Sequence, residues 1–258
     1  MDKAMLMMNR RISRRTWLAS VPVVGGLLLT TGCSRERFMP PTLRGGLIGA
    51  ADVLTMSSSR LLLSGPQLAR EYSLSDVADP FPTWNQTNPK DGEYQRHAAE
   101  GFKNWQLPIS GLVARPLALS LDQIKELASR TQITAHVCEQ GWSAIGEWTG
   151  APLQRVLEAA GGVTAAARYV VIDTYDRWYE AYDLFEVEHP QTILAYRLNG
   201  RDLPRGNGAP LRLRVERQCG YKNLKFVKSI RVVDSIAGIG KGTGGINSDA
   251  GFHWFAGV

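Results

Sequence analysis

Short apolar segments separated by turn residues are the feature that most constrains the fold of this chain after Trp105. WQLPISGLV begins at Trp105 and alternates apolar and polar residues, which predicts a strand. ITAHV, ARYVVIDTYD, LRLRVE and LKFVKSIRVVD predict further strands, and TILAYRL with the Asn199-Gly200 turn and RDLP predicts a hairpin. Strands mixed with short helices between hairpins predict an α+β domain with mixed sheets.

Three short helices are predicted between these strands. Ser120 and Gln123 have the spacing of a capping box ahead of DQIKELA, and Asp183 and Glu186 repeat that spacing at DLFEVEHP. Pro152 precedes a third helix, which we expect to end at the paired glycines of LEAAGG. These helices are too short to dominate the fold, so the strands set the architecture.

The first 33 residues have the three parts of an export signal: a basic front, an apolar stretch and a small-residue end. SRRTWL, with Arg14 and Arg15, resembles the motif that the twin-arginine translocase reads. TTGC resembles a lipoprotein cleavage box in which Cys33 is lipidated, although plain cleavage beside an incidental cysteine stays open. We therefore expect a periplasmic protein that meets the membrane only through a lipid anchor. Because that translocase exports folded proteins, the leader also indicates a cofactor inserted in the cytoplasm.

We expect three parts: the leader at 1–33, a tether and helical arm at 34–76, and a catalytic domain at 77–258. The arm contains GLIGAADVLTMSSSRLLL, whose apolar residues recur at helical spacing. The formal net charge is +6, but residues 1–32 hold five basic residues against one acidic residue. The rest of the chain is only slightly basic, so we expect no nucleic-acid partner.

Cys138 is placed where a chemical role is plausible. Ile133, Ala135 and Val137 alternate with polar residues and predict a half-buried strand that ends at Cys138, before the run EQGWSAIGEWTGAP. The chain has only three cysteines. From the residues alone, four roles remain open for Cys138: a core residue, half of a disulfide with Cys219, a nucleophile or a metal ligand.

Four sequence blocks follow one another: CEQGWSAIGEWTGAPLQRVLEAAG, VIDTYDRWYEAYDL, HPQTILAYRLNGRDLPRGNGAPLRLRV and GYKNLKFVKSIRVVD. Together they resemble the molybdopterin-binding domain of the sulfite oxidase family. They are most similar to its bacterial periplasmic branch, which includes the catalytic subunit of a protein-methionine-sulfoxide reductase. The resemblance spans about Phe81 to Asp234 and implies a sulfite-oxidase-type fold. The chain ends soon after the last block, so we expect no C-terminal immunoglobulin-like dimerisation domain.

The resemblance also implies the cofactor and its contacts. It implies a mononuclear molybdenum held by one pterin, molybdopterin, and by the thiolate of Cys138. Arg212 can meet the pterin phosphate with two donors and Lys225 adds a point charge. The full set of implied cofactor contacts is Asn85, Thr174, Asn207, Arg212, Asn223 and Lys225. Trp142 and Tyr179 are the implied residues on the substrate side.

The implied activity is two-electron oxygen-atom transfer, for which we favour reduction of an S- or N-oxide, as a small molecule or a protein-bound sulfoxide. Sulfite oxidation remains an alternative, although no arginine occurs in EQGWSAIGEW to bind the anion. No CxxCH haem motif occurs, so we expect a separate redox partner such as a cytochrome or a membrane haem protein. A cofactor-free envelope binding lipoprotein with a Cys138–Cys219 disulfide is the alternative from another class.

Overall fold

The computed structural model describes residues 47–62 and 67–258, with side chains from residue 53 onward. All of these residues belong to the unit Pro40–Val258. The predicted leader at 1–33, including Arg14, Arg15 and Cys33, lies outside the described residues. Within the described ranges, no helix is long and apolar enough to cross a membrane.

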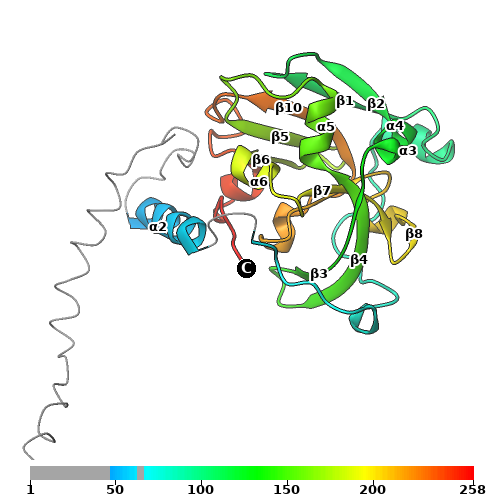
Figure 1. Cartoon of the computed structure of the whole chain (residues 1–258), viewed down its shortest axis with the longest axis horizontal. Helices are drawn as coiled ribbons and strands as arrows, with labels where there is room; N and C mark the ends of the chain where they lie inside the picture. The colour runs from blue at the N-terminus through cyan, green and yellow to red at the C-terminus, as the bar shows by residue number, and fades with distance from the viewer. Residues whose placement is uncertain (1–46, 63–66) are drawn as a thin grey trace, which may run out of the picture. The chain divides into compact units, whose positions relative to one another are not determined.

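Two five-stranded sheets form the body of the domain (Figure 1). The first has the order β2-β1-β10-β5-β6 and comprises Gln106–Gly111 (β1), Leu117–Ser120 (β2), Tyr169–Thr174 (β5), Tyr179–Asp183 (β6) and Val227–Val233 (β10). In it, β1 and β10 run parallel and the other neighbours are antiparallel. The second is antiparallel and comprises Arg130–Val137 (β3), Ser143–Pro152 (β4), Ile193–Leu198 (β7), Arg201–Asp202 (β8) and Arg212–Arg214 (β9).

Short helices connect the strands, as predicted. They are Gly92–Ala99 (α3), Leu121–Glu126 (α4), Leu153–Ala159 (α5), Leu184–Val187 (α6) and Ile246–Asp249 (α7). The predicted capping box at α4 is confirmed, since Ser120 accepts from the Gln123 amide at 3.2 Å and returns its own amide to the Gln123 side chain at 2.8 Å. Asp183 caps α6 by accepting from the Glu186 amide at 3.1 Å. The α+β fold class is therefore confirmed.

The expected arm helix is confirmed as Leu47–Leu62 (α2). Met56 is buried, and Arg60 forms an ion pair with Asp183 at the start of α6. Helix α2 therefore contacts the domain where β6 ends and α6 begins.

The longest strand, β4, was not predicted. Its sequence, SAIGEWTGAP, contains two glycines and a proline, which disfavour strands. At Gly150, a β-carbon would lie 2.2 Å from the carbonyl oxygen of Leu194. The glycine therefore lets β4 approach β7 closely, and pairing with β3 and β7 overrides the weak local propensity.

The predicted strand at 133–137 is confirmed as part of β3, but its buried face is the polar one. Gln132, Thr134 and His136 are buried, whereas Val137 is 36% exposed. The reason is a buried polar network that covers this face. Gln132 donates to the Glu216 carboxylate at 2.8 Å, so its burial costs little.

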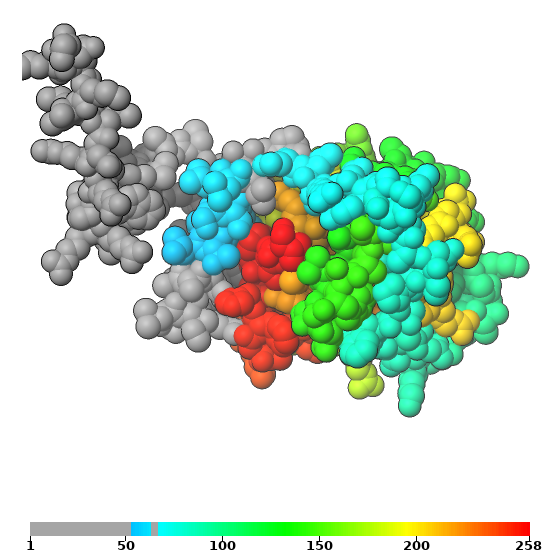
Figure 2. All heavy atoms as spheres, turned by 90° about the horizontal axis from the view of Figure 1, so that it is seen from below, coloured from blue at the N-terminus to red at the C-terminus, as the bar shows by residue number. Residues whose placement is uncertain are grey.

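The C-terminal segment, residues 236–258, folds back along residues 217–221. Gln218 and Gly257 form a β-bridge, the Cys219 amide donates to the Ala256 carbonyl at 2.8 Å, and the Val258 amide donates to the Arg217 carbonyl at 3.1 Å. Figure 2 shows this segment (red) at the surface of the molecule.

A buried ion pair between Lys222 and Glu180 also stabilises the position of the C-terminal segment. Lys222 donates to Glu180 at 2.6 Å, and both side chains are fully buried. The other Glu180 oxygen accepts from the Asn247 side chain at 3.0 Å. Strand β6, residues 217–222 and helix α7 are therefore held together by one carboxylate.

Candidate active site

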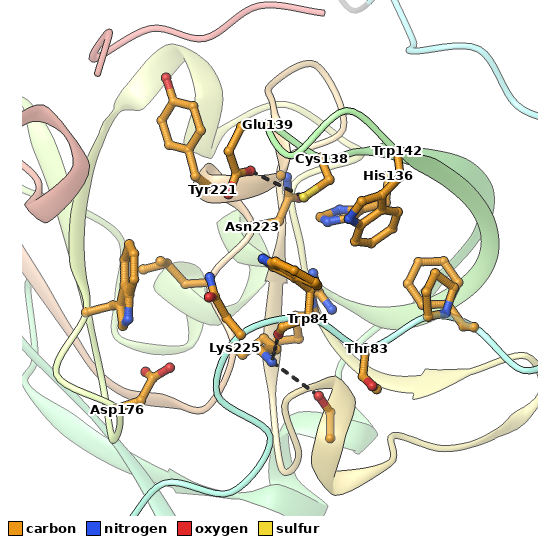
Figure 3. Close-up of a pocket in the computed structure, with 18 residues that line it drawn as sticks. Thr83, Trp84, His136, Cys138, Glu139, Trp142, Asp176, Tyr221, Asn223 and Lys225 are labelled. Carbon is orange, nitrogen blue, oxygen red and sulfur yellow. Dashed lines mark hydrogen bonds between the residues drawn. The ribbon is translucent and has the colours of Figure 1, made fainter. Parts of the chain in front are cut away.

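Strand ends and loops surround a cleft that encloses about 70 Å³ and is open to solvent (Figure 3). Four parts of the chain line it: residues 81–85, the end of β3 with the turn after it, the loop between β5 and β6, and residues 206–225. The cleft therefore brings together residues of all four blocks that carried the family resemblance, together with the loop at residues 81–85.

Cys138 reaches the cleft from a tight turn at the end of β3. Its amide donates to the Trp142 carbonyl at 2.9 Å and its carbonyl accepts from the Gly141 amide at 3.1 Å. Gly141 has φ of +87°, a conformation that favours glycine. The turn also brings Trp142 to the cleft, where it was predicted.

The thiol of Cys138 is buried, and this burial raises its pKa. The neighbouring Glu139 carboxylate, 3.6 Å from the sulfur, raises the pKa further. A thiol in these surroundings stays protonated unless a cation is bound next to it, because a metal ion stabilises the thiolate. The sulfur is therefore suited to ligation of a soft metal rather than to unassisted nucleophilic attack.

Arg212, on β9, provides a buried cation at the cleft. Its guanidinium lies 5.2 Å from the centre of the Trp148 ring and donates to the Asn207 carbonyl at 3.3 Å. Its Nε has no hydrogen-bond partner among the described residues. Burial, and then the charge of Arg214, lower the pKa of Arg212 to about 9.

Lys225 is the second cation at the cleft. Its ammonium donates to the carbonyls of Trp84 at 2.7 Å and Gly206 at 3.2 Å. Burial, and then the charge of Arg212, lower the pKa of Lys225 to about 8. The buried Arg212 guanidinium and the partly buried Lys225 ammonium, whose charge Arg212 disfavours, would both gain from a bound anion. Together with the unpartnered Nε, this arrangement fits the phosphate of a pterin cofactor.

Two other predicted cofactor contacts also line the cleft. Asn85 does so from residues 81–85, with φ of +57°. Asn223 lines the cleft as well, but its side chain is hydrogen-bonded to the backbone. It accepts from the Val215 amide at 2.7 Å and donates to the Cys219 carbonyl at 3.1 Å. Asn223 therefore shapes the wall of the cleft.

Three predicted site residues do not line the cleft. Thr174 donates to Asp176 at 2.5 Å and accepts from the Trp178 amide at 2.9 Å, so it positions two residues that do line the cleft. Asn207 donates to the Pro82 carbonyl at 3.2 Å. Both residues therefore support the loops of the cleft from behind.

Tyr179 is the third. Its hydroxyl donates to Asp249 of α7 at 2.5 Å, outside the cleft. Successive residues of a strand point to opposite faces. Trp178 takes the place at the cleft that the sequence interpretation gave to Tyr179.

Several lining residues were missed by sequence interpretation: Trp84, His136, Glu139, Asp176, Trp178 and Tyr221. His136 could have been predicted from the sequence, because it stands two residues before Cys138 and therefore lies on the same face of the strand. Its Nδ1 accepts a hydrogen bond from Arg214 at 2.8 Å, and burial, then Arg212 and Arg214, lower the pKa of His136 strongly. The neutral ring therefore accepts the guanidinium hydrogen at Nδ1.

Cys138 and Cys219 are both free thiols. The alternative prediction of a disulfide between them is therefore wrong in this structure. Residues 217–221 are held instead by the backbone pairing with the C-terminal segment.

The chain is similar to a known family and to several known proteins. Residues 94–237 match the family model described as the oxidoreductase molybdopterin binding domain. A protein of Azospira oryzae named putative protein-methionine-sulfoxide reductase subunit YedZ1 is 33% identical over 245 residues, which cover 95% of this chain and 88% of that protein. The protein-methionine-sulfoxide reductase catalytic subunit MsrP of Xanthomonas axonopodis pv. citri is 36% identical over 236 residues, which cover 85% of this chain and 68% of that protein. Among solved structures, the sulfane dehydrogenase SoxCD of Paracoccus pantotrophus matches with a TM-score of 0.49 and 23% identity, over 52% of this chain and 39% of that chain.

Proposed function

The chain belongs to the oxidoreductase molybdopterin binding domain family, the sulfite oxidase family, and from this premise we propose that it reduces sulfoxides. One observation carries the proposal: Cys138 lines the same cleft as Arg212 and Lys225, two cations whose pKa values are lowered there. The cysteine suits a soft metal and the cations suit a phosphate, as this enzyme class requires.

When bound, the molybdenum cofactor supplies two-electron oxygen-atom transfer. Cys138 would be its protein ligand. Arg212 and Lys225 would hold the phosphate, and Asn85 would contact the pterin. The aromatic walls of the cleft, including Trp142 and Trp178, would orient the substrate and exclude water from it.

We propose sulfoxides, small or protein-bound, as the substrate class. The names of two relatives refer to methionine sulfoxide. Aromatic residues and the Glu139 carboxylate line the cleft with Cys138, and no arginine occurs in EQGWSAIGEW, which follows Cys138. Aromatic faces suit the sulfur and methyl groups of a sulfoxide. Electrons would come from a separate partner such as a cytochrome or a membrane haem protein.

The experiment is a substrate panel with protein purified after native export. We expect about one molybdenum per chain and reduction of sulfoxides by a reduced dye. Ferricyanide-dependent oxidation of sulfite without sulfoxide reduction would replace this proposal with the alternative activity. Protein that is folded but contains no molybdenum after native export would reject the enzyme class for this chain.

Export is a further part of the proposal. Arg14 and Arg15 would direct the folded protein through the twin-arginine translocase to the periplasm, and Cys33 would carry a lipid. The double variant Arg14→Lys with Arg15→Lys should remain in the cytoplasm as precursor. Normal periplasmic accumulation of this variant contradicts the route. Cys33→Ala should release the exported protein from the membrane fraction, and an unchanged membrane fraction contradicts the anchor.

A further inference from the structure

Glu139 is a carboxylate at the sulfur end of the cleft. It follows Cys138 directly, and its oxygen lies 3.6 Å from the cysteine sulfur. Figure 3 draws this contact as a dashed line between Glu139 and Cys138. The side chain is exposed and lines the cleft. In the described part of the chain, no lysine or arginine forms an ion pair with it. Its charge is therefore available to whatever enters the cleft.

The charges of the cleft are divided between two ends. Lys225 and Asp176 interact electrostatically at one end, close to Arg212. Glu139 lies at the other end, beside the Cys138 sulfur. Arg212 also interacts electrostatically with Cys138, so its positive charge acts at the sulfur until the cofactor phosphate neutralises it. With the phosphate bound, the Glu139 carboxylate is the charge that remains beside the proposed metal ligand.

We propose that Glu139 selects substrates by charge: it repels oxyanions such as sulfite from the metal-facing end and leaves that end to neutral oxides. The proposal rests on the proposed function, because it assigns the substrate end of the same site. Two like charges a few ångströms apart repel at the effective dielectric of a protein surface, and water and salt reduce but do not abolish that repulsion. A neutral sulfoxide experiences no such penalty.

A charged side chain at the substrate end allows one fold to distinguish anionic from neutral substrates. A cofactor that transfers an oxygen atom does not by itself distinguish sulfite from a sulfoxide. Discrimination must come from groups that differ in their interaction with the two substrates. In this cleft, Glu139 is the lining carboxylate in contact with the cysteine sulfur, so it is the residue placed to discriminate.

The test uses the holoenzyme, in which the cofactor phosphate occupies the cationic end. Glu139→Gln removes the charge and keeps the shape, and Glu139→Asp keeps the charge. Glu126→Gln is the matched control, because it removes the same charge from exposed helix α4, outside the cleft. Sulfate is the probe, and its dissociation constant is measured by calorimetry, which requires no turnover. The Michaelis constant for dimethyl sulfoxide is measured in parallel.

We expect Glu139→Gln to bind sulfate about tenfold more tightly than the parent, since a close like-charge contact has been removed. Glu139→Asp and Glu126→Gln should bind sulfate as the parent does, and the Michaelis constant for dimethyl sulfoxide should change less than about twofold in Glu139→Gln. Equal sulfate affinity in the parent and in Glu139→Gln overturns the proposal.

The two proposals fail differently. A protein that reduces no sulfoxide, yet binds sulfate more tightly in Glu139→Gln, rejects the proposed function and upholds charge selection. A protein that reduces sulfoxides with unchanged sulfate affinity in Glu139→Gln rejects charge selection alone.

Discussion

Replacing Arg212 by methionine should stabilise the cofactor-free protein and weaken its hold on the cofactor. A lowering of the Arg212 pKa from 12.5 to about 9 corresponds to roughly 5 kcal/mol by which the folded protein disfavours the charge. At neutral pH the residue is charged in both the folded and the unfolded chain, so the folded state bears this penalty fully. Methionine fills a similar volume without charge.

Two favourable interactions oppose the gain. The contact with the Trp148 ring and the hydrogen bond to the Asn207 carbonyl are each worth on the order of 1 kcal/mol. Replacement of buried charge by apolar side chains stabilises other proteins by about 1–4 kcal/mol. We therefore expect Arg212→Met to raise the free energy of unfolding by about 2 kcal/mol, which raises the melting temperature by roughly 4–8 °C.

The assay compares thermal unfolding of protein made without molybdate with the molybdenum retained by holoenzyme after dialysis. Retention should fall in Arg212→Met, because each lost charge-assisted hydrogen bond to a phosphate weakens binding by about 1.5–3 kcal/mol. Arg214→Met is the matched control on the same strand. Arg214 is paired with Glu216 at 2.5 Å, so its loss strands a buried carboxylate and should destabilise by about 3–5 kcal/mol. If cofactor-free Arg212→Met melts at or below the melting temperature of the parent, the buried charge of Arg212 does not destabilise the cofactor-free fold.

Three further outcomes are expected. Cys138→Ser should abolish turnover and molybdenum binding without loss of fold, whereas Cys219→Ser should stay active; equal effects on activity would contradict the ligand assignment. Lys222→Met should lower the free energy of unfolding in urea by about 3–5 kcal/mol, because it leaves the buried Glu180 carboxylate unpaired. The double variant Lys222→Met with Glu180→Gln should recover part of this loss of stability. A double variant as unstable as Lys222→Met would mean that the two residues are not coupled. Burial, and then Arg217, lower the pKa of His189 from 6.5 to about 4, so below pH 6.5 the unfolded chain binds the proton first; stability should fall by roughly 2–3 kcal/mol between pH 6.5 and 4. His189→Gln should flatten this pH dependence, and an unchanged slope in chemical denaturation would refute it.

Local signals predicted most of the elements, because caps and turns act over a few residues. The hairpin at Asn199-Gly200 formed as expected, with both residues at positive φ. Strand β4 escaped prediction because Gly150 is required by close contact with β7 and Gly146 by close contact with Phe81 and Trp148, and the local sequence does not indicate these contacts. Parallel pairing of β1 with β10 joins residues distant in sequence and could be predicted only through the family resemblance.

The structure brings some of the predicted site residues to one cleft and leaves others outside it. Cys138, Arg212 and Lys225 line one cleft, as the resemblance implied. Tyr179 points out of the cleft, because which face of a strand is buried depends on its partners and not on its own sequence. The same reason hid His136, whose strand buries its polar face against Arg214.

The pairing of the C-terminal segment with residues 217–221 has a consequence for biosynthesis. The wall of the cleft that carries Tyr221 and Asn223 is completed by hydrogen bonds from residues as late as Ala256 and Val258. Those residues are synthesised after residues 81–225, which line the cleft. The complete wall therefore forms only after residues 256–258 have been synthesised, and a cofactor would meet the complete cleft only from that point on.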